Sequence, residues 1–105
     1  MSYREVKNCI EEGRLEEAFA MAKKDFETDN NEWTCLALFE VLKHICMREL
    51  ERRNDEQAEK CIRLMETLKQ GLADQAKAER IINSLRISFI PYAAELNDAL
   101  RKSRQ

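Results

Sequence analysis

The fold is decided by the stretch Trp33-Thr-Cys-Leu-Ala-Leu-Phe-Glu-Val-Leu-Lys-His-Ile-Cys-Met47. In a helix, Leu38 and Leu42 lie on one broad apolar arc of this stretch, and Trp33 and Met47 lie largely on the other. A helix with apolar side chains on nearly every side is buried against more than one neighbour. The stretch therefore predicts a central helix on which the other elements pack.

The composition favours a single all-α domain over residues 1–105. Charged residues make up 36% of the chain, and it contains only two glycines and one proline, which suits long helices joined by few turns. A chain of this length normally forms one domain. The polar ending Arg101-Lys-Ser-Arg-Gln105 leaves open that this domain is a fragment of a longer protein.

Charge and hydropathy limit the partners and the compartment. The 18 basic and 20 acidic residues give a net charge of −2, whereas nucleic-acid binding requires a basic surface. No apolar run reaches the roughly 18 residues of a membrane span, and the N-terminal part lacks the apolar core of a signal peptide. We therefore expect a cytoplasmic protein that does not enter a membrane and for which nucleic acid is a poor partner.

Two helices are predicted before the central one. The first covers about residues 2–12; Ser2 and Glu5 have capping-box spacing, and Gly13 ends it. The second covers about 14–28 and carries an apolar stripe of Leu15, Ala18, Phe19, Ala22 and Phe26. Because the link across Gly13 is short, these helices should be antiparallel neighbours.

Turn residues place the central and fourth helices. Asp29 and Glu32 have the spacing of a second capping box, which would open the central helix. That helix becomes highly charged over residues 48–53, so we expect this end to be solvated. A fourth helix starts at Asn54, stops at Gly71 and buries Ala58, Cys61, Ile62, Met65 and Leu68.

The last part of the chain permits two readings. Asp74 can cap a fifth helix with an apolar face of Ala78, Ile81, Ile82 and Leu85. Pro91 removes a backbone donor and clashes with the preceding turn, so this helix must kink or break within residues 86–91. Helix would then resume through Tyr92. A strand over 86–90 is the alternative.

Short motifs give the chain a partial resemblance to a known repeat. Gly13-Arg-Leu-Glu-Glu-Ala18, followed by Ala22, resembles the start of the second helix of a tetratricopeptide repeat. Trp33-x-x-Leu36-Ala37 resembles the first helix of a following repeat, and Asn54-Asp-Glu-Gln-Ala58 resembles a second copy of the Ala18 segment. The resemblance covers about residues 13–65.

The resemblance implies antiparallel helix pairs stacked as a short solenoid, with a groove that binds a peptide or protein segment. The sequence also departs from the family pattern. Ala18 and Ala58 are 40 residues apart, against about 34 in the standard repeat, and Glu40 stands where an aromatic residue is expected. A five- or six-helix bundle, whose small residues recur because close packing needs them, is the alternative.

The sequence contains no catalytic or metal-binding motif, so we expect no enzyme and no cofactor. His44 is the only histidine, which excludes histidine-based triads and multi-histidine metal sites. The four cysteines, at positions 9, 35, 46 and 61, lack the close pairs of a zinc site and lie among apolar residues. They are therefore expected to pack as small hydrophobic residues. Cys35 lies near a helix start, which can lower a thiol pKa, but its apolar neighbours work against ionisation.

We predict a non-enzymatic protein–protein interaction module or scaffold whose groove is lined by the first helix of each pair. Its contact candidates are Tyr3, Trp33, Glu40, Lys43, His44 and Met47, with Trp33 equally suited to the core. A self-assembling domain, such as a homodimer, is the second hypothesis, and its apolar seam would be Phe89, Ile90, Tyr92 and Leu96.

Two basic clusters could recognise an acidic peptide or phosphate, or could simply be solvated helix faces. They are Arg48/Arg52/Arg53 and Lys77/Arg80/Arg86.

Overall fold

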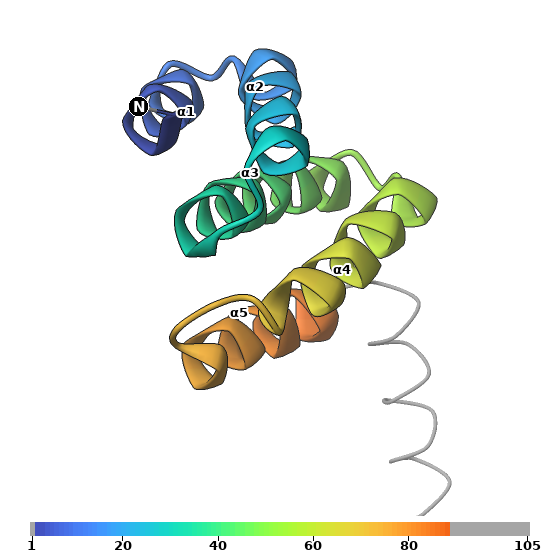
Figure 1. The fold of residues 1–105 in the computed structure, drawn as a ribbon. Coiled ribbons are helices and arrows are strands. Elements are labelled where there is room, and N and C mark those ends of the chain that lie inside the picture. Colours follow the sequence, from blue (N-terminus) through green and yellow to red (C-terminus); the bar gives the residue numbers. More distant parts are fainter. Residues whose placement is uncertain (1, 89–105) are drawn as a thin grey trace, which may run out of the picture.

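Helix α3 is the element that every other described helix contacts (Figure 1). The computed structural model describes residues 2–88, which form α1 (Ser2–Glu11), α2 (Leu15–Thr28), α3 (Glu32–Glu51), α4 (Asp55–Lys69) and α5 (Gln75–Ser88). No strand occurs within this range. The all-α prediction is therefore confirmed, with helix bounds close to those expected.

The predicted break before Pro91 falls mostly outside the described residues. α5 is helical as far as Ser88, so the first part of the alternative strand is excluded. The kink itself and the helix expected to follow it lie beyond this point. So does the predicted seam of Phe89, Ile90, Tyr92 and Leu96.

The core of the protein is built on α3, as its sequence predicts. Buried residues come from more than one side of this helix: Cys35, Ala37, Leu38, Phe39, Val41, Leu42 and Cys46. α1 and α2 lie on one side of α3, and α4 and α5 lie on the other (Figure 1). The second apolar arc is only partly covered, because Trp33 is 61% exposed and Met47 is 45% exposed.

Small residues allow the neighbouring helices to approach α3 closely. Ala18 and Ala22 of α2 and Ala58 of α4 are completely buried. α2 and α4 also make the most extensive contacts with α3. A larger side chain at any of these alanines would push a helix away from the core. This confirms the role that the sequence assigns to Ala18 and Ala22.

Helices α1 and α3 end in the same hydrogen-bonded motif. After α1, Gly13 has φ 80° and the Arg14 amide donates to the Cys9 carbonyl at 2.9 Å. After α3, Arg53 has φ 59° and the Asn54 amide donates to the Glu49 carbonyl at 2.8 Å. This arrangement favours glycine at the left-handed position, which Gly13 satisfies and Arg53 does not.

We expect Arg53→Gly to raise the free energy of unfolding by about 0.5–1 kcal/mol. Removing a strained left-handed residue gains somewhat more than this, and the added flexibility of the unfolded chain offsets part of it. Gly13→Ala should have the opposite sign and lower the free energy by about 1 kcal/mol, since nothing lies within 4 Å of the added Cβ. Urea unfolding measures both changes. A destabilised Arg53→Gly would contradict this cap geometry.

The cap that opens α3 differs from the predicted one. Asn31 is the N-cap: its Oδ1 accepts from the amides of Trp33 (2.8 Å) and Thr34 (3.0 Å). The Thr34 hydroxyl in turn accepts from the Asn31 amide at 3.0 Å. The predicted box of Asp29 and Glu32 is wrong, because Asp29 is the extended residue that ends α2. The predicted cap of α5 is confirmed by an Asp74 Oδ1 bond to the amide three residues on (3.0 Å).

The charged end of α3 contains a buried carboxylate, so the prediction of a wholly solvated end is wrong. Glu49 is only 6% exposed. Its Oε1 accepts from Arg48 Nη2 at 3.0 Å, and its Oε2 accepts from Asn54 Nδ2 at 3.1 Å. Arg48 Nη1 also donates to Glu16 Oε1 of α2 at 2.5 Å. The Asn54 side chain therefore binds Glu49 instead of capping α4, and these polar contacts join α2 to the α3–α4 turn.

Candidate functional site: the groove between α3 and α5

A groove runs between α3 and α5 because these helices touch only lightly, while each packs on α4. It consists of two adjoining cavities of about 700 and 260 Å³. Both cavities are lined by Lys43, Lys77 and Ile81, so they form one continuous surface. We call this surface the α3–α5 groove.

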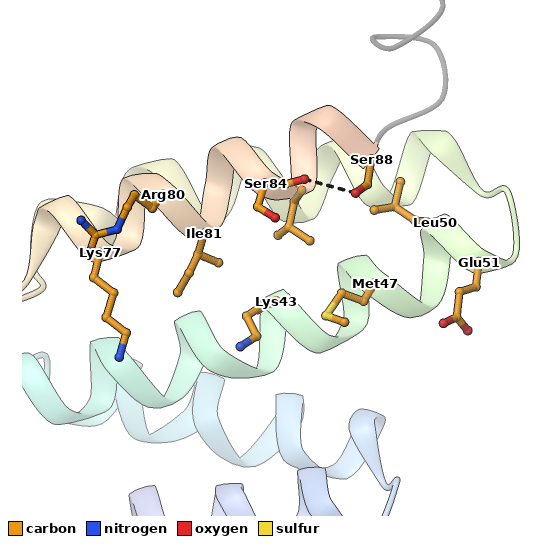
Figure 2. Close-up of a pocket in the computed structure, with 10 residues that line it drawn as sticks. Lys43, Met47, Leu50, Glu51, Lys77, Arg80, Ile81, Ser84 and Ser88 are labelled. Atoms are coloured by element: carbon orange, nitrogen blue, oxygen red, sulfur yellow. Dashed lines mark hydrogen bonds between the residues drawn. The ribbon is translucent and has the colours of Figure 1, made fainter.

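The floor of the larger cavity is apolar. Met47 and Leu50 of α3 meet Ile81 and Leu85 of α5 there. Figure 2 shows Ile81 reaching from α5 toward α3, with Met47 on the α3 side of the same gap. The Ser88 hydroxyl is turned back onto its own helix, where it donates to the Ser84 carbonyl at 3.2 Å. The two serines therefore add little bulk, and the floor stays open to solvent.

The rim of the larger cavity is basic. Lys43, Lys77 and Arg80 line it, and Glu51 is its only acidic residue. In Figure 2, Lys77 extends from α5 toward α3, and the carboxylate of Glu51 points away from α5. None of these three cations forms an ion pair with another residue of the described range 2–88. The rim of the larger cavity therefore carries three cations and one carboxylate.

The smaller cavity is lined by acidic residues in addition to the two lysines that it shares with the larger one. Glu32 and Glu40 of α3 and Asp74 before α5 contribute carboxylates, and Leu36, Phe39 and Leu72 contribute apolar surface. The cations Lys43, Lys77 and Arg80 therefore lie between these carboxylates and Glu51, which is at the C-terminal end of α3 (Figure 2).

The structure brings together three of the six predicted contact residues in the α3–α5 groove: Glu40, Lys43 and Met47. Tyr3 and Trp33 instead meet each other, with ring centroids 5.7 Å apart in an edge-to-face arrangement. They line a separate hollow, bounded by α1, α2 and the start of α3. His44 is half-buried and lines neither surface.

Electrostatic effects link these residues further. Burial raises the pKa of the Tyr3 hydroxyl, and the nearby Glu40 carboxylate raises it further. Glu40 therefore acts on Tyr3 of α1 as well as lining the smaller cavity. Burial lowers the pKa of His44, and the charge of Lys43 adds to this effect. These effects disfavour the charged form of His44, while the charge of Glu40 opposes them.

Sequence reasoning missed the half of the groove that α5 supplies. Lys77, Arg80 and Arg86 read as one basic cluster, but Arg86 pairs with Glu66 of α4 and is removed from the rim. The sequence does contain a stripe of polar and apolar residues that could have indicated this side of the groove. It consists of Lys77, Ile81, Ser84 and Ser88, at spacings of four, three and four residues. Such a stripe marks one side of a helix, but it does not tell which neighbour faces that side.

The cysteines serve the packing of the helices. All four are buried free thiols. Cys35 Sγ donates to the Leu68 carbonyl oxygen at 3.1 Å, and Cys46 Sγ lies 3.6 Å from the Ala58 carbonyl oxygen. Burial raises the pKa of the Cys35 thiol and raises that of Cys46 to about 12. The raised pKa of Cys35 agrees with the expectation that its apolar neighbours work against ionisation.

Within residues 2–88, no group of three or more histidine, cysteine or acidic side chains is placed to hold a metal ion. The same range contains no helix with the length and apolar character needed to cross a membrane.

Comparison with known proteins gives no further guide to function. No family model, curated protein or solved structure matches this chain.

Proposed function

We propose that this protein is a non-enzymatic interaction module of helical-repeat type that binds a peptide or protein segment in the α3–α5 groove. The observation that supports this best is the open apolar floor of the larger cavity. Met47, at the centre of this floor, is 45% exposed, although it belongs to the most apolar helix of the chain. A volume of about 700 Å³ falls within the usual size of ligand-binding clefts.

The order of the helices also supports the proposal. In a stack of antiparallel pairs, the first helix of each pair lines one common surface that holds the bound segment. Here α1, α3 and α5 are the first helices, and α3 contacts both of the others. The groove lies between two of these first helices, where the tetratricopeptide resemblance would place it.

Self-association is the second candidate, and one observation favours it. Ile87, near the end of α5, is 66% exposed, and it lies just before the predicted apolar seam that begins at Phe89. Solution mass measurement across the micromolar range tests this alternative. A dimer would support it, and a monomer at every concentration would reject it.

A selection from a random peptide library tests the proposed groove. Met47→Glu should weaken the selected peptides at least tenfold, because it places a carboxylate on the apolar floor. Leu64→Glu is the matched control: Leu64 lies on α4, is 49% exposed and lines none of the described cavities. Both variants should keep the melting temperature of the parent protein.

Two outcomes of this selection would reject the proposed function. One is that no peptide is selected above background. The other is that the two variants change the affinity equally.

A further inference from the structure

We propose that the segment bound by the α3–α5 groove is acidic: its carboxylates contact Lys43, Lys77 and Arg80, and neighbouring apolar side chains rest on Met47 and Ile81. This inference rests on the proposed function and specifies its ligand class. It follows from the distribution of charge around the groove, since a binding surface and its partner carry complementary potentials.

The first step concerns the ion pairing of the three cations of the rim. Other arginines of the same two helices are used internally: Arg48 is paired with Glu49 and Glu16, and Arg86 is paired with Glu66. Lys43, Lys77 and Arg80 line the larger cavity without an ion pair inside the described range. The larger cavity thus holds three cations and one carboxylate around its apolar floor, so carboxylates of a ligand can match the excess of positive charge there.

The second step is the partly apolar setting of these charges. Lys43 is half-buried, with Met47 one helical turn away on the same side of α3. A charge pair formed at such a partly desolvated site is screened less by water and salt than an exposed pair. A ligand that combines carboxylates with apolar residues would satisfy both the rim and the floor.

The third step excludes the undescribed end of this chain as the best-matched occupant. Residues 89–105 contain two acidic residues and three basic ones, Arg101, Lys102 and Arg104. A segment with an excess of positive charge does not complement a basic rim. An acidic segment of another protein fits better.

The carboxylates of the smaller cavity also limit where the acidic part of the ligand can lie. Glu40 and Asp74 line the smaller cavity, so like-charge repulsion disfavours carboxylates there. The acidic part of the ligand should therefore lie at Lys43, Lys77 and Arg80, and a neutral or basic part should lie toward Glu40.

The test uses three fluorescein-labelled 12-residue peptides with one apolar frame, carrying four glutamates, four glutamines or four lysines. We expect the glutamate peptide to bind at least tenfold tighter than the glutamine peptide at low salt, and to weaken as salt is added. Lys77→Glu should abolish this preference. Lys23→Glu, which makes the same change of charge on exposed α2, should leave it intact.

Lys77→Glu is expected to fold, since it places a glutamate three residues after the N-cap Asp74, a favourable position at a helix start. Melting curves of the two charge-reversal variants check this point.

The outcomes separate the ligand class from the groove itself. Equal affinity for the glutamate and glutamine peptides, or an equal loss in Lys77→Glu and Lys23→Glu, would overturn the acidic ligand while leaving the groove in place. Tighter binding of a single-stranded oligonucleotide than of the glutamate peptide would also overturn it. Failure of all peptides, selected ones included, would reject the proposed function.

Discussion

Replacing Leu42 with alanine is expected to lower the free energy of unfolding by about 2–5 kcal/mol, the usual range for a buried leucine. Leu42 is 2% exposed and lies on α3, the helix that every other described helix contacts. The cavity left behind cannot collapse easily, because helices hold α3 on both sides. Since small domains unfold at a cost of only about 5–15 kcal/mol, this single change removes a large part of the stability.

Urea unfolding of Leu42→Ala beside Leu64→Ala measures this effect. Leu64 is 49% exposed, so the same chemical truncation should cost less than about 1 kcal/mol there. Similar losses in the two variants would contradict the position of α3 between two layers of helices.

Gly71→Ala is expected to destabilise the protein by about 1–3 kcal/mol, the usual cost of overpacking a well-packed site. A Cβ at position 71 would lie 2.9 Å from Cys35 Sγ, closer than real Cβ contacts allow. The sulfur cannot move away freely, because it is buried and donates to the Leu68 carbonyl oxygen. The turn between α4 and α5 would have to shift instead.

A double-mutant cycle with Cys35→Ala identifies the cause of this effect. Cys35→Ala removes the sulfur, and the nearest remaining atoms, the Leu68 carbonyl oxygen and Cys35 Cβ, would lie 3.6 and 3.8 Å from the new methyl group, both ordinary contacts. The loss caused by Gly71→Ala should therefore be smaller in the Cys35→Ala background than in the parent protein. Additive losses in the unfolding free energy would rule out the steric explanation.

The sequence predicts the helices well because their signals are local. Gly13 ends α1, and the stripe from Leu15 to Phe26 defines α2, without reference to any distant residue. The apolar residues on nearly every side of α3 are likewise visible in the local sequence. Burial of Ala18 and Ala58 also follows from the sequence, since small residues at helical spacing mark close helix contacts.

The missed features depend on residues that meet only in the folded chain. Glu49 looks solvated in sequence because charged residues surround it, yet packing of the helices buries it, and its contacts with the nearby Arg48 and Asn54 satisfy the carboxylate. Arg48 is fixed by Glu16, a partner 32 residues away. No local pattern reveals such pairs.

The candidate groove was predictable only on its α3 side. Glu40, Lys43 and Met47 belong to the apolar-to-polar boundary of one helix, which the sequence displays. The α5 side of the groove depends on how the turn around Gly71 places α5 beside α3. It also depends on the ion pair between Arg86 and Glu66. Both are tertiary effects, so Lys77 and Arg80 appeared as an ordinary solvated face.

The buried carboxylate of Glu49 limits how this chain can be recombined. A foreign helix pair grafted after α3 would have to supply an amide donor in the place of Asn54, because leaving a buried acceptor without its hydrogen bond costs about 1–3 kcal/mol. A graft at the Gly13 turn meets no such requirement, since backbone hydrogen bonds and an exposed ion pair between Arg14 and Glu12 close that turn. In protein engineering, the helices that follow the Gly13 turn should therefore be replaceable. After the α3–α4 turn, only a helix pair with a matching amide side chain should be tolerated.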